Sequence, residues 1–191
     1  MKIFLIRHGQ TTGDIEDRYG GDYDDNLTEQ GKDQSRKLAE ELCCFGIEKI
    51  IASHKIRAQE TASILAARLN VPIEVMEDFR ERNHYGVMTG MTKQDALLKY
   101  PDLVSILKDP HQAISGAELY SDFQKRIMSA LRSVTALPCE VVAVVTHGGP
   151  IRMIFRDILK KGEIKIEDCA YAELECFNNQ FSLVRVEGIS Y

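Results

Sequence analysis

The chain has 191 residues, of which 44% are hydrophobic and 28% are charged, and its net charge is −5. This size and composition predict one globular domain, residues 1–191, that can bury a hydrophobic core, and they exclude a disordered chain. The acidic balance argues against nucleic-acid binding, because that affinity comes mainly from neutralising many backbone phosphates. A local cluster of arginines could still bind a small anion.

The sequence gives no sign of secretion or membrane insertion. Its first residues lack the charged region, the apolar core and the cleavage site of a signal peptide, and no apolar stretch is long enough to span a bilayer. The five cysteines are odd in number and include no C-x-x-C pair, which argues against a disulfide framework and a zinc site. We therefore expect a cytoplasmic protein with reduced cysteines and no membrane partner.

Short β-branched runs alternate with longer amphipathic stretches along the chain. In order, we expect a strand at 2–6, a helix at 29–42, a strand at 49–52, a helix at 55–69, a strand at 73–76, helices at 93–100 and 119–135, a strand at 141–145, a helix at 150–160 and strands at 171–177 and 181–186. This alternation predicts an α/β fold: a three-layer, doubly wound, mostly parallel sheet with helices on both faces.

Three details refine this expectation. The last two strands, joined across Asn178 and Asn179, are predicted to form a hairpin. The helix at 119–135 carries an apolar stripe that we interpret as core: Leu119, Phe123, Ile127, Leu131 and Val134. The least regular stretches, 78–91 and 108–116, are expected to be loops over the sheet, where substrate selectivity often lies.

Two histidines occupy the same kind of position after predicted strands. His8 follows the strand at 2–6, and His147 follows the strand at 141–145. Ligands of open α/β sheets bind beyond the carboxyl ends of the strands, so we expect both imidazoles to lie at one edge with Ser53, which follows a third strand. One imidazole can attack phosphorus while another holds the phosphoryl oxygens. The pattern therefore favours a phosphoryl-transfer enzyme.

The residues around these histidines are suited to an anion. Arg7 and Arg57 are expected at the same edge of the sheet. Three glycines would let the backbone approach the ligand closely: Gly9, Gly148 and Gly149. The turn into the helix that begins at Pro150 is expected to present free N–H groups and the positive end of the helix dipole to the anion.

Other patterns predict no metal or cofactor. Residues 22–26 resemble the start of a calcium loop, but Leu27 stands where an EF-hand needs Gly and Asp33 where it needs Glu. No Walker A or dinucleotide-binding fingerprint occurs. The remaining histidines are interpreted as surface residues: His54, His84 and His111.

Four sequence blocks follow one another along nearly the whole chain. They are Arg7-His8-Gly9-Gln10-Thr11 with Arg18-Tyr19-Gly20-Gly21, then Ser53-(x)3-Arg57-Ala58, then Glu81-Arg82-(x)2-Tyr85-Gly86, and finally Val145-Thr146-His147-Gly148-Gly149. Together they resemble the signature of the histidine phosphatase superfamily, which includes cofactor-dependent phosphoglycerate mutases. The resemblance implies a phosphoglycerate mutase-like fold.

The resemblance also implies catalytic roles. His8 would be the nucleophile, since a neutral imidazole with a pKa near ~6.5 can attack phosphorus at neutral pH and form a phosphohistidine. Arg7, Arg57 and His147 would clamp the phosphoryl oxygens. Glu81 would protonate the leaving alkoxide and then activate water. No metal is required for this chemistry.

Weaker candidates for the acid are Glu77 and Asp78. Tyr85 and Lys93 match the segment in which mutases bind the carboxylate end of their substrate, which favours a small, multiply anionic substrate. The predicted substrate-binding set is completed by three glycines: Gly20, Gly21 and Gly148.

Three activities are compatible with the resemblance. The paired arginines that mutases place after the lysine are missing from 102–108, and the chain is shorter than the mutases. A phosphohistidine that is not tightly retained is open to water, so the expected function is hydrolysis of a small phosphorylated metabolite. Mutase-type transfer is the alternative. A third possibility is a catalytically weak protein that binds phosphate esters.

Departures from the family pattern bear on that third possibility. Asp14 stands where many relatives place Asn, and a carboxylate there repels a phosphate dianion unless it is turned away, paired with Arg or protonated. Gln10 replaces the usual Glu. One extra residue between Glu81 and Tyr85 could shift the acid. Oligomeric state is not predicted, because one sequence does not locate sheet edges or apolar patches.

Overall fold

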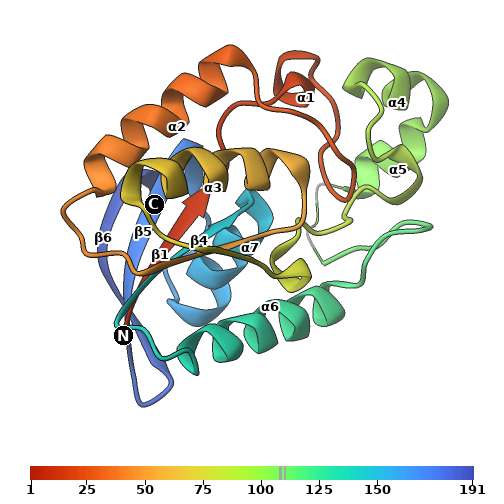
Figure 1. Cartoon of the computed structure of the whole chain (residues 1–191). Helices are drawn as coiled ribbons and strands as arrows, with labels where there is room; N and C mark the ends of the chain where they lie inside the picture. The colour runs from red at the N-terminus through yellow and green to blue at the C-terminus, as the bar shows by residue number, and fades with distance from the viewer. Residues whose placement is uncertain (108, 110) are drawn as a thin grey trace.

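The computed structural model describes residues 1–107, 109 and 111–191. Within these residues, six strands form one sheet in the order β3-β2-β4-β1-β5-β6 (Figure 1). The strands are β1 (Lys2–Arg7), β2 (Lys49–Ala52), β3 (Ile73–Val75), β4 (Val141–Thr146), β5 (Lys165–Phe177) and β6 (Gln180–Ser190). The strands β3, β2, β4 and β1 are parallel, whereas β5 and β6 run antiparallel at one side. The mostly parallel sheet of the sequence analysis is confirmed.

Helices cover both faces of the sheet, as predicted (Figure 1). On one face, α2 (Glu29–Leu42) and α3 (Ile56–Leu69) pack against Phe4 and Ile6 of β1. On the other face, α6 (Tyr120–Thr135) and α7 (Gly148–Met153) pack against the alternate residues Ile3 and Leu5. These four side chains of β1 are all fully buried, because a central parallel strand is covered on both sides. The result is a three-layer α/β fold.

The hairpin at the end of the chain is also confirmed. Asn178 and Asn179 join β5 to β6, and their φ angles are 49° and 61°. Asparagine tolerates this left-handed region better than most residues, and two such residues in a row suit a tight hairpin turn. The strand β5 begins six residues before the predicted one, at Lys165. Cys169, with φ 56°, breaks its regular register and hides the early part of the strand from pattern analysis.

Several short helices were not predicted. They are α1 (Thr12–Ile15), α5 (Pro101–Ile106) and the 3-10 turns η1 (Glu77–Phe79) and η2 (Gly86–Met88). The predicted helix at 93–100 ends one residue early, as α4 (Lys93–Lys99), because Pro101 has the fixed φ of a first helical residue and starts a new helix.

The predicted loop at 78–91 is partly wrong, since it contains the 3-10 turn η2 and the end of η1. It is also anchored in the fold, because Phe79 and Met88 are fully buried. In the predicted loop at 108–116, Lys108 and Pro110 lie outside the described residues. The other residues of that stretch form no helix or strand.

Two helix predictions are corrected in detail. The predicted helix at 150–160 begins earlier, at Gly148, and continues after Met153 as a π-helical turn, η3 (Ile154–Ile158). Leu119 was assigned to the apolar stripe of α6, but it precedes the helix and is 55% exposed. The other four members of that stripe are buried as predicted.

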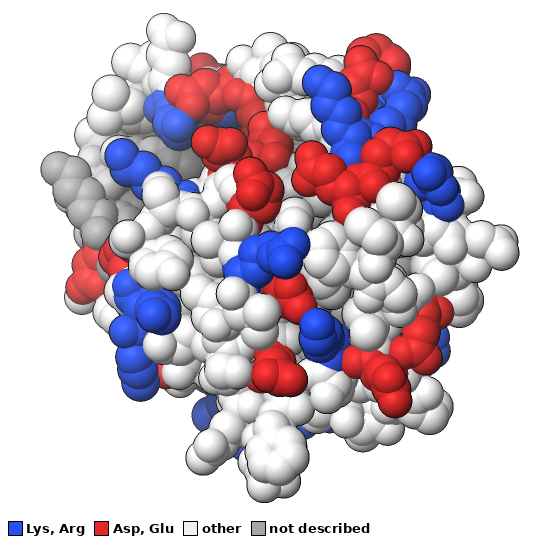
Figure 2. Space-filling model, turned by 90° about the vertical axis from the view of Figure 1, so that its left-hand side faces the viewer, with Lys and Arg blue, Asp and Glu red and all other residues white. Residues whose placement is uncertain are grey.

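The surface carries mixed charge. Figure 2 shows one side of the molecule, on which acidic and basic side chains lie intermingled. All five cysteines are unpaired, and Cys43 and Cys44 are exposed. In the described part of the chain, no helix is long and apolar enough to cross a membrane.

Candidate active site

The carboxyl ends of three neighbouring strands bring the predicted residues together. β1 ends at Arg7 beside Thr146 of β4, and Ala52 of β2 lies beside Val145. The next residues along these strands are therefore adjacent: His8, His147 and Ser53. The rings of the two histidines are 5.1 Å apart, in an edge-to-face arrangement of 62°. The predicted meeting of these residues at one edge of the sheet is confirmed.

His8 is a buried, neutral imidazole. Its Nδ1 lies 2.8 Å from the carbonyl oxygen of Gly9, so Nδ1 carries the proton and Nε2 keeps its lone pair. Burial lowers the pKa of His8 well below its usual value, and the charges of Arg57 and Arg7 lower it further. The ring is thus in the form that can attack phosphorus.

Arg57 lies between the two histidines and is 3% exposed. Its Nε is 3.2 Å from Nε2 of His8 and 3.2 Å from Nδ1 of His147. The other guanidinium nitrogens are held by the segment after α1, where Nη1 donates to the Asp25 carboxylate at 2.8 Å and Nη2 to the Gly21 carbonyl at 3.2 Å. These contacts fix the guanidinium beside the nucleophile.

His147 is fully buried and does not line the cavity. Its Nε2 is 2.8 Å from the Ser53 hydroxyl, and its Nδ1 accepts from Arg57. Burial lowers its pKa well below the usual value, followed by the charges of Arg57 and His8. His147 is therefore a second neutral imidazole, hydrogen-bonded to Arg57.

Arg7 is held by the first residues of β5. Its Nη1 donates to the Ile166 carbonyl at 2.9 Å, and its Nη2 is 3.0 Å from the Asp168 carboxylate. Burial raises the pKa of Asp168, while the positive charge of Arg7 opposes that rise. Asp168 was missed by the sequence analysis because the strand was expected to begin only at residue 171.

The Asp14 carboxylate has two partners in the structure, Thr11 and Arg7. One of its carboxylate oxygens accepts from the backbone N–H and the hydroxyl of Thr11, at 2.8 and 2.9 Å, and so completes the capping box of α1, in which Thr11 is the N-cap. The other oxygen is 3.7 Å from Arg7. The carboxylate is both committed to a helix cap and paired with an arginine, which reduces its repulsion of a phosphate.

Glu81 is fixed by two backbone N–H groups. Gly149 donates to its Oε2 at 2.9 Å, and Arg82 donates to its Oε1 at 2.8 Å. The expectation of free N–H groups at the start of α7 is therefore wrong at Gly149, whose N–H is occupied by Glu81. A Cβ at Gly149 would lie 2.0 Å from Oε1, so this close approach requires glycine.

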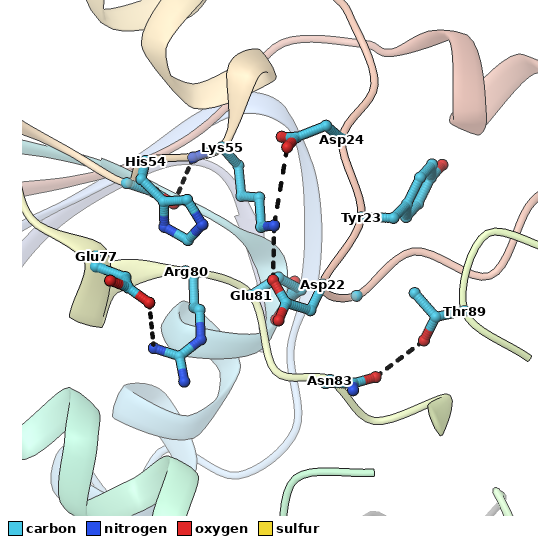
Figure 3. A network of polar contacts seen from close by, with 12 residues as sticks. Asp22, Tyr23, Asp24, His54, Lys55, Glu77, Arg80, Glu81, Asn83 and Thr89 are labelled. Carbon is cyan, nitrogen blue, oxygen red and sulfur yellow. Dashed lines mark hydrogen bonds and ion pairs between the residues drawn. The ribbon is translucent and has the colours of Figure 1, made fainter. Parts of the chain in front are cut away.

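The weaker acid candidates lie away from the site. Neither Glu77 nor Asp78 is among the residues that line the cavity, and Glu77 is an exposed partner of Arg80 at 3.8 Å (Figure 3). The extra residue between Glu81 and Tyr85 does not remove Glu81 from the cavity. Asn83 in that stretch secures the following turn, because its side-chain oxygen accepts from Thr89 at 2.9 Å (Figure 3).

The calcium-like segment is held by cations. Lys55, which precedes α3, reaches Asp22 at 2.7 Å and Asp24 at 4.0 Å (Figure 3). Asp25 pairs with Arg57. The acidic residues of this segment thus neutralise Arg57 of α3 and Lys55 at the N-cap of that helix. Across the described ranges, no group of three His, Cys, Asp or Glu side chains is placed to hold a metal ion.

A cavity of about 300 Å³ lies at this edge of the sheet, beside His8 and Glu81. Eight of the ten predicted site residues line it: Arg7, His8, Gly20, Gly21, Arg57, Glu81, Tyr85 and Gly148. Lys93 does not, because its exposed ammonium pairs with Asp17 outside the cavity. Its proposed contact with substrate stays a prediction without a contact to support it.

Several further residues of the cavity wall were not found from the sequence, among them Tyr120, Arg152 and Arg156, and His84, interpreted as a surface residue, also lines the cavity. Tyr120 opens α6, and the two arginines lie on α7 and the π-helical turn. All three come from predicted helices whose side chains were not assigned to the site. Their polar side chains are visible in the sequence, but no sequence motif connects these residues with the two histidines.

The family model of the histidine phosphatase superfamily (branch 1) matches residues 3–188. The chain belongs to this superfamily. It is 31% identical over 157 residues to the uncharacterized phosphatase PhoE of Bacillus subtilis, covering 82% of this chain and 76% of that one. It is 32% identical over 164 residues to a metal-independent phosphoserine phosphatase of Arabidopsis thaliana, covering 81% and 67%.

A solved structure supports the same assignment. YhfR of Bacillus stearothermophilus superposes with a TM-score of 0.89 at 27% identity, and the match covers 98% of this chain and 96% of that one. The histidine phosphatase fold and the phosphoglycerate mutase-like architecture expected from the sequence are therefore confirmed.

Proposed function

We propose that this histidine phosphatase is a metal-independent phosphomonoester hydrolase that acts on a small phosphorylated metabolite through a phosphohistidine at His8. The observation that carries the proposal is the state of His8: a buried neutral ring whose Nδ1–H is donated to Gly9, with Nε2 beside Arg57. A ring held in this tautomer needs no separate base, and its Nε2 lone pair, which accepts from the Nε–H of Arg57 in this structure, becomes available to phosphorus once that N–H turns toward a phosphoryl oxygen.

The first step transfers the phosphoryl group to the protein. Nε2 of His8 attacks phosphorus, a P–N bond forms, and the P–O bond to the leaving group breaks. Arg7 and Arg57 stabilise the charge on the equatorial oxygens of the loose transition state. Glu81, in its protonated form, gives its proton to the leaving oxygen.

The second step regenerates the enzyme. The Glu81 carboxylate takes a proton from water as the water oxygen attacks phosphorus, and the P–N bond breaks to release inorganic phosphate and neutral His8. Gly149 and Arg82 hold the carboxylate in place for both steps. We propose that His147 assists as a donor once Arg57 has turned its Nε–H toward a phosphoryl oxygen: the neutral ring then carries its proton on Nδ1, and its Nε2 accepts from the Ser53 hydroxyl.

Phosphate release from a panel of phosphomonoesters in EDTA tests this proposal. Wild type is expected to remain active, and His8→Ala is expected to lose turnover almost completely. Substituting Arg132, an exposed residue of α6, by Ala provides the matched control. Activity that disappears with EDTA and returns with Mg²⁺, or that persists in His8→Ala, would contradict the proposal.

Mutase-type transfer is the second candidate, and it is favoured by Tyr85, which lines the cavity as the mutase resemblance implies. The position of Lys93 outside the cavity weighs against it. The two activities differ in their response to a bisphosphorylated primer, which a mutase needs and a hydrolase does not. Hydrolysis without primer therefore supports the first candidate.

A further inference from the structure

The cavity is basic although the chain is acidic. Of the residues that the structure describes, six arginines and three carboxylates line it, while the net charge of the whole chain is −5. The phosphoryl site uses Arg7 and Arg57. Two others already have acidic partners, since Arg18 pairs with Glu16 and Arg156 with Asp157 and Glu163.

Arg152 differs from these. Within 1–107, 109 and 111–191, no ion pair or hydrogen bond engages its guanidinium, although the side chain is partly buried in the cavity wall. A partly desolvated guanidinium without an acceptor is unfavourable, and a bound carboxylate or phosphate would supply two parallel acceptors.

The position of Arg152 relates it to the leaving group. Helical side chains point back toward the N-terminus of their helix, and a Cβ at Gly148 would lie 2.7 Å from Nη1 of Arg152. The next residue, Gly149, holds Glu81. Since Glu81 protonates the leaving oxygen in the proposed reaction, Arg152 lies on the side where the leaving group extends.

Tyr85 lies in the same part of the wall. Burial raises the pKa of its hydroxyl, and the positive charge of Arg152 acts against that rise. The two side chains are thus electrostatic neighbours, and the hydroxyl is a neutral donor near the guanidinium. Together they form a polar surface on the leaving-group side of the cavity.

We propose that Arg152 binds a second anionic group, a carboxylate or a phosphate, on the leaving-group part of the substrate. This inference rests on the proposed hydrolysis at His8. It assigns to Arg152 the role that the mutase resemblance gave to Lys93, whose ammonium is paired with Asp17 outside the cavity. Substrates with one phosphoryl group and a second negative charge are therefore preferred.

Matched substrates test this inference. We would compare kcat/KM for O-phosphoserine with O-phosphoethanolamine, for 3-phosphoglycerate with glycerol 1-phosphate, and for a sugar bisphosphate with its monophosphate. A charge-assisted contact predicts a preference of about 10- to 100-fold for the more anionic member of at least one pair. The first two pairs report a carboxylate, and the third reports a phosphate.

Variants link the preference to Arg152. In Arg152→Met the ratio within the preferred pair is expected to fall to about one, whereas Arg152→Lys, which keeps the charge, retains part of it. Arg36→Met removes an arginine from the surface of α2, where it pairs with Asp33, and is expected to keep the full ratio. This control separates a local contact from a change in net charge.

The outcomes are distinguishable. Wild-type hydrolysis of an aryl phosphate with no preference within any pair would overturn the inference and leave the proposed function standing. An equal loss for both members of each pair in Arg152→Met would also overturn it, because Arg152 would then hold the transferred phosphoryl group. A wild-type protein that hydrolyses no substrate would overturn the proposed function, and this inference with it.

Discussion

The chemistry of this site depends on two imidazoles that the fold keeps neutral. His8 and His147 are buried, and each has a pKa well below the usual value, first because of burial and then because of Arg57. A neutral ring is required for attack by His8. The same burial makes the stability of the folded state depend on pH, since protons bind these rings only after unfolding.

Acid is therefore expected to destabilise the protein below the ordinary histidine pKa of about 6.5. Each ring contributes a loss of at most about 1.4 kcal/mol per pH unit, because the unfolded chain takes up a proton that the folded chain excludes. Urea unfolding at pH 7.5, 6.5 and 5.5 measures this slope. His8→Gln should make it smaller between pH 6.5 and 5.5, and an unchanged slope would contradict the account.

Gly149→Ala is expected to lower kcat by roughly 10²- to 10⁴-fold, the range of general acid–base catalysis, because the added Cβ would displace the Glu81 carboxylate. A double-mutant cycle with Glu81→Gln tests the cause. If the effect acts through Glu81, the double variant is no slower than Glu81→Gln alone. Additive losses would show that Gly149 serves another purpose.

Asp14→Asn is expected to improve phosphate binding only modestly, by about two- to fivefold, because the charge removed lies 3.7 Å from Arg7 and is partly exposed. An asparagine oxygen can still accept from Thr11 and cap α1. Inhibition by inorganic phosphate measures the change. A gain of several hundredfold would mean that Asp14 suppresses an otherwise stronger site.

At the scale of secondary structure, the site is built where elements end. β1, β2 and β4 deliver His8, Ser53 and His147 at neighbouring positions, and α7 starts immediately after His147. The antiparallel strand β5 adds a different function. Its irregular beginning, around Cys169, lets Asp168 and the Ile166 carbonyl reach Arg7.

Asp168 is accordingly a positioning residue for Arg7. Asp168→Ala is expected to raise KM about tenfold and to change kcat less, because the guanidinium loses its nearest carboxylate while the Ile166 carbonyl and the more distant Asp14 remain. Asp168→Asn should restore part of the affinity. Glu167→Gln is the matched control, since that neighbour is exposed. A loss confined to kcat would contradict this role.

At the scale of the whole molecule, the central sheet and its two helical layers could be predicted because buried parallel strands and amphipathic helices have distinct sequence periods. The same pattern predicted that His8 and His147 meet at one edge of the sheet. The family resemblance implied that Lys93 belongs to the site but did not reveal that Asp17 engages it. Asp168 was missed because its strand begins earlier than the periodicity indicates, and Arg152 was missed because no motif connects it with the histidines although it lies within the predicted helix at 150–160.

The central claim is that hydrolysis proceeds through His8. The most direct measurement is rapid-quench trapping of a labelled phosphoryl group on the protein, in EDTA, during turnover of an aryl phosphate. We predict an acid-labile label on His8 in wild type and none in His8→Ala. Rapid phosphate release without a labelled protein in wild type, or an equal label in His8→Ala, would contradict the account.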